Sequence, residues 1–264
     1  MIPKVIHYCW FGGNPKPELI EKCISSWRKF CPDWEIIEWT ESNYDVQIYS
    51  YMKEAYDAKK WAFVSDVARL DVVAKYGGFY LDTDVELMAP IDELTENEAV
   101  YVFETERNIN TGMGFGAAAG HPTVTAMLNY YQDCHFLKNG KPDLTPCPAC
   151  NTEMLVQVCP QFRRNGRYQM EDGVLLLGYG DYPKYMKHYG TATWGDKPKL
   201  VTSDSKWVYK DTRLKRFLKR PESFDFIEKY FGTKGVKTYT FAVYDLMERG
   251  ILYFIKRGLR KLLR

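Results

Sequence analysis

The sequence lacks several features that would place a protein in a special class. Its 36 Lys and Arg residues nearly balance 34 Asp and Glu residues, and the formal net charge of +2 does not indicate a nucleic-acid partner. No uninterrupted apolar run reaches the roughly 20 residues that a membrane-spanning helix needs. Internal repeats and low-complexity stretches are also missing, which argues against repeat and disordered proteins.

The start of the chain and its cysteine content bear on localisation. Met1 is followed immediately by a predicted core strand, which leaves no room for a signal segment. Seven cysteines, an odd number, fit a reducing compartment better than a disulfide framework. We therefore expect a cytoplasmic protein. A content of 45% hydrophobic and 16% aromatic residues predicts a globular chain with a substantial core.

One cysteine motif, Cys147-Pro148-Ala149-Cys150, raises the question of a metal site. Cys134, His135 and Cys159 could supply further ligands. Structural zinc usually has four ligands, and these spacings match no common zinc pattern. We expect free thiols in a Pro-rich loop, with structural zinc as the alternative.

Alternating strand and helix patterns predict an α/β fold. β-Branched and aromatic residues bounded by turn residues predict strands at 4–11, 34–39, 79–81, 99–103 and 113–118. Helical spacing predicts helices that open at Pro17, cover 61–76 and run from Pro122 to Tyr130. Ligands of such sheets gather at the carboxyl ends of the strands, where this prediction places Trp10 and Asp82.

Two carboxylates, Asp82 and Asp84, directly follow the predicted strand at 79–81. Side chains two residues apart on an extended backbone point to the same side, so both acids can approach one ion. An Asp-x-Asp triplet alone is weak evidence, because about one occurs by chance in a chain of this size. The preceding helix and the glycine pair Gly77-Gly78 strengthen it.

The helix predicted at 61–76 carries a charged pair, Asp66 and Arg69, on a face other than its main apolar face. Gly77 stands where a C-terminal cap belongs. One interpretation is an exposed ion pair. The other is that the pair points at the ligand of Asp82, with Asp66 accepting from sugar or ribose hydroxyls and Arg69 donating to them.

The run Ser65-Asp66-x-x-Arg69, followed by the segment 77–84, resembles the sugar-nucleotide core of the DXD glycosyltransferases. The family in question, glycosyltransferase family 32, contains the yeast initiating mannosyltransferase and capsular polysaccharide synthesis enzymes. The opening segment 2–13 is similar to the start of the same family, and the large clostridial toxins share the central motif more distantly. The resemblance thins beyond Gly120. It implies a GT-A fold, a Rossmann-like mixed sheet flanked by helices, with a helical C-terminal extension.

The resemblance also implies an activity. A retaining glycosyltransferase would use Mn²⁺ or Mg²⁺, held by Asp84 with Asp82 directly or through water, to stabilise the leaving diphosphate. The donor would be a nucleotide sugar, with a UDP-sugar favoured and GDP-mannose as the alternative. The acceptor would be a saccharide or a lipid-linked oligosaccharide in bacterial capsular or surface polysaccharide synthesis. No carboxylate is marked as a covalent nucleophile or general base.

Further residues are predicted to contact the donor. Tyr8 and Trp10, at the end of the first strand, either contact the nucleobase or pack under the first loop. Tyr80 belongs to the strand before Asp82. Asn110 opens a stretch of small residues that lets the backbone approach a ligand, and by resemblance this stretch lies beside the sugar and acceptor.

The segment 188–194 looks like a degenerate form of the closing element of the family. If so, His188 or Thr193 completes the metal shell and the Trp194 indole N–H reaches the diphosphate. The alternatives are a surface histidine and a core tryptophan.

The last segment, 244–264, mixes apolar residues at helical spacing with only basic charges after Glu248. This pattern predicts an amphipathic helix that binds an anionic membrane surface, the protein's own core or a second subunit. We therefore divide the chain into a glycosyltransferase domain at 1–240 and a basic amphipathic helix at 241–264. Because the acceptor is expected on a lipid, we favour peripheral contact with the inner face of the plasma membrane.

Two other functions remain open at this point. A sugar-nucleotide hydrolase would use the same cation and diphosphate site but transfer the sugar to water. A non-catalytic nucleotide-sugar or carbohydrate-binding protein is less favoured, because two buried acids are unstable without a bound cation.

Overall fold

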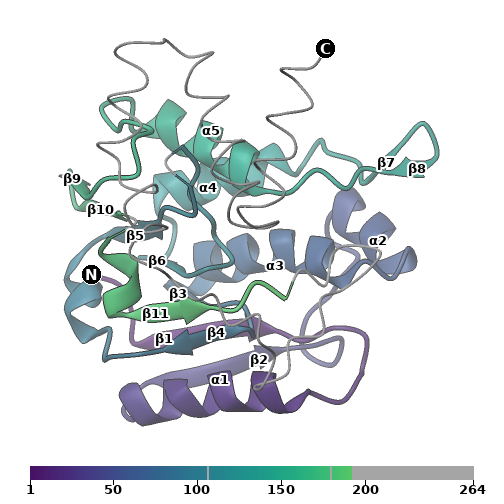
Figure 1. The fold of residues 1–264 in the computed structure, drawn as a ribbon. Coiled ribbons are helices and arrows are strands. Elements are labelled where there is room, and N and C mark those ends of the chain that lie inside the picture. Colours follow the sequence, from purple (N-terminus) through teal and green to yellow (C-terminus); the bar gives the residue numbers. More distant parts are fainter. Residues whose placement is uncertain (106, 179, 192–264) are drawn as a thin grey trace, which may run out of the picture. The chain divides into compact units, whose positions relative to one another are not determined.

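A mixed seven-stranded sheet forms the centre of the computed structural model (Figure 1), which describes residues 1–105, 107–178 and 180–191. The strands lie in the order β2 (Glu35–Trp39), β1 (Val5–Cys9), β3 (Gly78–Tyr80), β6 (Phe115–Ala117), β5 (Ala99–Val102), β10 (Val174–Leu177) and β9 (Gln169–Glu171). Strands β6 and β9 run antiparallel to their neighbours, and the other pairs are parallel. The predicted α/β class is confirmed.

The chain order reverses at β1, which lies between β2 and β3. Because both neighbours are parallel to β1, the carboxyl ends of these three strands meet at one edge of the sheet. Ligands of open α/β sheets bind at such a reversal point. Trp10 follows β1 and Leu81-Asp82 follow β3, so this edge carries the residues that the sequence singles out.

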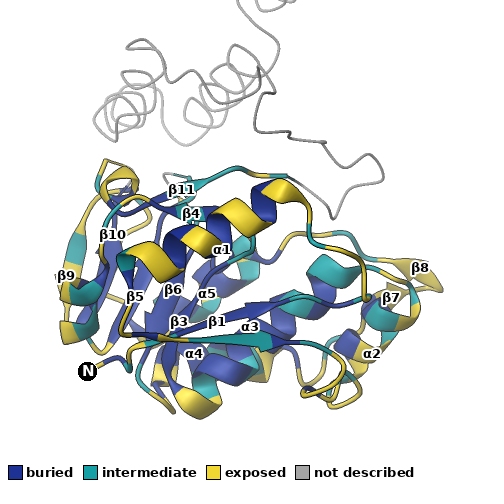
Figure 2. Ribbon diagram, turned by 90° about the horizontal axis from the view of Figure 1, so that it is seen from below, coloured by how far each residue is buried: buried dark blue, intermediate teal, exposed yellow. Residues whose placement is uncertain are grey.

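Helices cover both faces of the sheet (Figure 1). On one face lies α1 (Glu18–Phe30), which begins after Pro17 as predicted. On the other face α3 (Trp61–Tyr76) contacts β1, β3 and β6. The remaining helices α2 (Ser50–Asp57), α4 (Pro122–Tyr130) and α5 (Pro148–Val158) pack on the α3 side. Figure 2 shows the outer face of α1 exposed and its inner face buried, as expected of an amphipathic helix.

Alternation along the strands divides the core in two. Phe79 and Leu81 point into the α1 side, and Tyr80 points into the α3 side. All three are almost fully buried, since a sheet covered on both faces has no solvent-facing side. Tyr80 therefore faces α3, the helix that carries Asp66 and Arg69.

A second, smaller ladder lies beside the main sheet. Strand β4 (Val85–Leu87) pairs antiparallel with β11 (Met186–His188), so that His188 lies opposite Val85. A short hairpin joins β7 (Leu137–Lys138) and β8 (Lys141–Pro142). Two 3₁₀ helices, Asp92–Glu96 and Tyr182–Lys184, complete the described elements. The sequence analysis predicted neither β4 nor β11.

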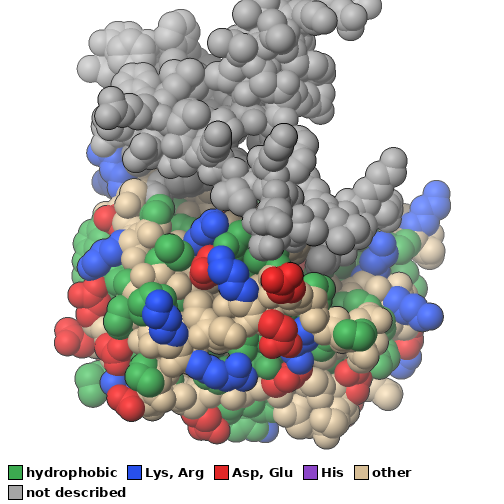
Figure 3. All heavy atoms as spheres, turned by 60° about the horizontal axis from the view of Figure 1, so that its bottom comes forward, with side chains coloured by type: hydrophobic (Ala, Val, Ile, Leu, Met, Phe, Trp, Pro, Cys, Tyr) green, Lys and Arg blue, Asp and Glu red, His purple; other side chains and the backbone are tan. Residues whose placement is uncertain are grey.

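Several expectations concern the surface and the chain beyond residue 191. Acidic and basic side chains are interspersed on the described face that Figure 3 presents. Within the described residues no helix has both the length and the apolar character to span a membrane. The predicted helix at 241–264, together with Thr193 and Trp194, lies outside the described residues.

Candidate functional site

A pocket of about 690 Å³ opens at the carboxyl ends of β1 and β3. This volume is in the range of small-molecule and cofactor sites. Both aromatic and charged side chains line it. The predicted site residues that line it are Trp10, Asp66, Arg69, Tyr80, Asp82, Asp84, Asn110 and His188. The structure thus brings together residues from α3, β3, β11 and three loops.

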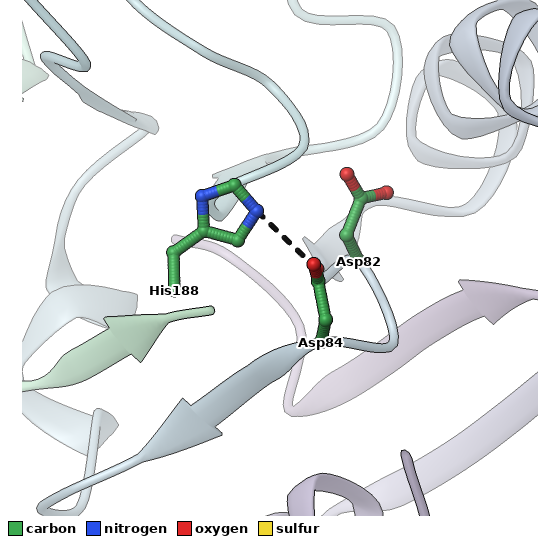
Figure 4. A group of neighbouring side chains, drawn as sticks. All are labelled: Asp82, Asp84 and His188. Carbon is green, nitrogen blue, oxygen red and sulfur yellow. Dashed lines mark ion pairs between the residues drawn. The ribbon is translucent and has the colours of Figure 1, made fainter. Parts of the chain in front are cut away.

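Asp82, Asp84 and His188 form a potential metal centre in this pocket (Figure 4). One ligand atom from each of the three lies within 4.8 Å of the others. Pairing of β11 with β4 creates the cluster, because it sets the last residue of β11 beside the residue that precedes β4. Two carboxylates and an imidazole suit Mn²⁺, and the oxygen ligands also suit Mg²⁺. The residues present therefore fit the metal that the resemblance implies.

Asp84 is the most firmly held of the three. Its Oδ2 accepts hydrogen bonds of 2.8 Å from both the backbone N and the Oγ1 of Thr191, and its Oδ1 lies 3.3 Å from His188 Nε2. Burial favours the neutral acid, but the charge of His188 and these hydrogen bonds outweigh it and lower the pKa of Asp84 below its ordinary value. Asp84 is therefore a carboxylate at neutral pH.

The pKa of the His188 imidazole shifts in the opposite direction. Burial opposes its charged form, but the neighbouring Asp84 carboxylate outweighs burial and raises the pKa of His188 to about 9. Without a metal ion, the ring is therefore protonated at neutral pH and balances the charge of Asp84. An incoming cation has to displace this proton before the imidazole can bind it.

The pair Asp66 and Arg69 is buried, not exposed. Asp66 is 8% and Arg69 4% exposed. Arg69 Nη1 lies 3.1 Å from Asp66 Oδ1, and Nη2 lies 3.0 Å from Asp82 Oδ1. The guanidinium also lies 5.1 Å from the centre of the Tyr80 ring, within cation–π range. Arg69 therefore joins the helix pair to the first acid of the Asp-x-Asp motif, a contact that the sequence analysis did not predict.

Gly112 gives Asp82 its space. A Cβ built at this position would overlap Asp82 Oδ2 and would lie 3.1 Å from Arg69 Nη1. The backbone N of Gly112 donates to Asn110 Oδ1 at 2.7 Å, and the Asp82 N donates to the Gly112 carbonyl at 2.9 Å. The small-residue stretch after Asn110 thus supports Asp82, while Asn110 itself lines the pocket.

The two aromatic candidates after β1 differ in position. Trp10 lines the pocket, and its Nε1 donates to the Asn14 carbonyl at 2.7 Å. Tyr8 does not line the pocket that the described residues form. Its hydroxyl donates to Glu38 at 2.9 Å and its ring packs edge-on to Trp27. Tyr8 is therefore a packing residue in this structure and does not reach the pocket.

Trp61 also lines the pocket, and we call Trp10 and Trp61 the aromatic wall. Gly12 has a φ of +89°, and a Cβ at this position would lie 2.6 Å from Trp61 Cε2. Only glycine combines this backbone conformation with such a close approach. The loop after β1 therefore packs directly against the first residue of α3.

The motif at Cys147 lies next to the pocket. All seven cysteines are described and none forms a disulfide. Cys150 Sγ donates to the Cys147 carbonyl, His135 pairs with Glu54 at 2.7 Å, and neither belongs to the three-residue metal group found among the described residues. The geometry favours free thiols over zinc.

The sequence analysis did not predict that two further side chains, Thr191 and Cys147, belong to the site. Thr191 lies within the segment 188–194, where the family pattern directed attention to Thr193. Cys147 contacts Arg69 at 3.8 Å, but its motif suggested a separate metal site. Both residues belong to segments that the sequence analysis singled out. The sequence therefore identified the segments but not which of their residues contact Asp84 and Arg69.

Comparison with known proteins gives a family match for part of the chain. Residues 17–101 match the family described as "Glycosyltransferase sugar-binding region containing DXD motif". The matched region includes Asp66, Arg69, Asp82 and Asp84.

Two curated relatives come from Schizosaccharomyces pombe. Inositol phosphoceramide mannosyltransferase 1 is 33% identical over 52% of this chain and 43% of its own length. Inositol phosphoceramide mannosyltransferase 3 is 33% identical over 48% of this chain and 36% of its own length. The chain thus spans less than half the length of these relatives.

Among solved structures, PaToxG glycosyltransferase aligns with a TM-score of 0.47 at 20% identity, over 60% of this chain and 70% of that one. The sequence comparisons therefore identify residues 17–101 as similar to the sugar-binding region of DXD glycosyltransferases.

Proposed function

We propose that the chain is a divalent-metal-dependent glycosyltransferase that uses a nucleotide-sugar donor and retains the anomeric configuration. The observation that carries this proposal is the cluster of Asp82, Asp84 and His188 in one pocket with the buried pair Asp66 and Arg69. The family match at 17–101 supports the sugar-binding part of the proposal. Retention is an implication of the family resemblance.

The pocket provides separate places for the parts of a nucleotide sugar. Asp84, His188 and Asp82 would hold Mn²⁺ or Mg²⁺, which would neutralise charge that develops on the leaving diphosphate. Asp66 would accept hydrogen bonds from sugar hydroxyls, and Arg69 would fix the direction of Asp66 and Asp82. The aromatic wall that includes Trp10 would pack against the nucleobase.

The donor and acceptor are proposed from the family resemblance, the names of the relatives and the sequence of the last segment. A UDP-sugar is favoured by the family resemblance, and the names of the two mannosyltransferase relatives support GDP-mannose as the alternative. A lipid-linked saccharide of a bacterial surface polysaccharide is the proposed acceptor. The basic pattern at 241–264 supports peripheral contact with the inner membrane surface. Truncation after Thr240 should then weaken sedimentation with anionic liposomes at low salt, and equal sedimentation would contradict that contact.

The experiment that tests the function is a donor screen. UDP- and GDP-sugars, each with Mn²⁺ and with chelator, should be compared by thermal shift, because a ligand that binds only the folded state raises Tm. We expect one donor to raise Tm only with the metal, and the same donor to yield a glycosylated saccharide product. Binding without transfer to any acceptor would contradict a transferase. Release of free sugar without an acceptor would identify a hydrolase.

A further inference from the structure

The residue before α5 reaches the charged part of the pocket. Cys147 lines the pocket, and only 6% of it is exposed. Its sulfur accepts from Arg69 Nη1 at 3.8 Å, and the same Nη1 lies 3.1 Å from Asp66 Oδ1. Cys147 therefore contacts the buried pair through Arg69, and it comes from an element that the sugar-binding family region at 17–101 does not contain.

A second set of buried polar contacts holds Cys147 from the opposite side. Thr111 Oγ1 lies 4.0 Å from Cys147 Sγ, and Asn151 Nδ2 donates to Thr111 Oγ1 at 3.0 Å. Thr111 and Asn151 are both fully buried. Buried polar side chains that bond to one another restrict each other's rotamers. The thiol is thus fixed between α5 and α3.

Arg69 depends on few other contacts for its orientation. Its Nη atoms bond to Asp66, Asp82 and the Cys147 sulfur, and its Nε has no hydrogen-bond partner among the described residues. A guanidinium is planar and its donors point in fixed directions. If the Arg69 guanidinium shifts where it contacts Cys147, the direction of its Nη2 bond to Asp82 therefore changes as well.

We propose that Cys147 is a positioning residue for donor-sugar contacts: its sulfur accepts from Arg69 Nη1, the nitrogen that also pairs with Asp66. This inference rests on the proposed donor site. The sulfur acts as a neutral thiol, because burial together with the Asp66 charge raises the pKa of Cys147 well above its ordinary value. Serine can accept from Arg69 and share a hydrogen bond with Thr111 as the thiol does, and alanine can do neither.

Kinetic comparison of three variants tests this role. Cys147→Ala should lower kcat/KM for the donor about tenfold, and Cys147→Ser should stay within about threefold of wild type. The affinity for Mn²⁺ alone should fall less than kcat/KM in the alanine variant, because Asp84 and His188 keep their contacts and only Asp82 is affected. Cys150→Ala is the matched control, since its Sγ bonds to a backbone carbonyl and not to the pair. Equal losses in the serine and alanine variants would overturn the proposal.

A second measurement does not depend on catalysis. Alkylation of Cys147 by N-ethylmaleimide can be followed by peptide mass spectrometry, with Cys134, whose pKa does not depend on Asp66, as internal reference. In Asp66→Asn the rate of Cys147 relative to Cys134 should rise at least about fivefold, because the Cys147 thiol loses the charge that suppresses its thiolate.

The two measurements separate the possible failures. An unchanged alkylation ratio would mean that the Asp66 charge does not act on the Cys147 thiol and would overturn the proposal, whatever the activity. If wild-type protein transfers sugar from no donor, the proposed function fails, and the alkylation ratio still decides whether Cys147 is tied to Asp66.

Discussion

His188 Nε2 lies 3.3 Å from Asp84 Oδ1, although the two residues come from distant parts of the chain. The antiparallel pairing of β11 with β4 creates this proximity. In the metal-free protein the two side chains neutralise each other, and in the proposed holoprotein both would face the cation. This change of partner makes metal binding measurable through the proton that His188 has to lose.

Binding of Mn²⁺ at pH 7.5 should release about one proton. The pKa of His188 is raised to about 9, so the free ring is charged at this pH, whereas a metal ligand must be neutral. The apparent affinity should rise with pH and level off above about pH 9. Calorimetric titrations in buffers of different ionisation enthalpy measure the release. His188→Gln should abolish it, and an unchanged proton count in that variant would refute the assignment.

Asp84→Asn should weaken Mn²⁺ binding at least about tenfold. Asparagine keeps an oxygen for Thr191 but loses the charge that balances His188, so Tm should also fall by a few degrees, roughly 2–4 °C for each 1 kcal/mol lost. Glu86→Gln is the control, because Glu86 lies two residues further along the chain but bonds to Lys22 and Tyr189. Wild-type Mn²⁺ affinity in Asp84→Asn, measured by calorimetry, would rule out the metal site.

Arg69→Ala should destabilise the fold as well as abolish turnover. Both members of its pair with Asp66 are buried, and removal of one partner from a buried ion pair costs about 3–5 kcal/mol. Urea unfolding would measure this loss. Asp66→Asn should keep most of the stability but lower donor-dependent kcat/KM at least about tenfold. Asp57→Asn, in an exposed pair with Lys53, should change neither property.

Gly112→Ala should reduce turnover without a large loss of stability. The new Cβ would overlap Asp82 Oδ2, and the least disruptive response is rotation of the Asp82 carboxylate away from Arg69. Kinetics with saturating Mn²⁺ should show at least about a tenfold lower kcat/KM, with a Tm near that of wild type. Gly180→Ala adds a methyl group where no atom lies within 4 Å and should behave as wild type. Full activity of Gly112→Ala would mean that the position of Asp82 is unimportant.

Local patterns were sufficient for much of the fold. The spacing of Phe63, Val67 and Leu70 predicted α3, and Gly77 ends it with a φ of +68°. The pattern left open whether Asp66 and Arg69 are exposed, because burial of a charged helix face depends on what packs against it. Here Asp82 and Cys147 come from other elements and supply the partners that make burial tolerable.

Long-range pairing explains what the sequence could not predict. Strand β11, Met186-Lys187-His188, lacks β-branched residues and the aromatic strand formers that marked β3, and its register decides whether His188 or a neighbour reaches Asp84. The contact of Cys147 with Arg69 likewise depends on how α5 packs on α4 and α4 on α3. The sequence therefore identified the acids by their spacing, but it could not identify the groups that surround them.

The ladder of β4 and β11 also has a consequence for fragment design. The family region at 17–101 contains Asp82 and Asp84 but ends well before β11. A fragment cut to that region would carry two acids of the metal group, without the imidazole and without Thr191 to orient Asp84. Expression boundaries chosen from the family match alone would thus remove one of the three residues of the metal group and the residue that orients Asp84. A fragment meant to keep both must extend through Thr191.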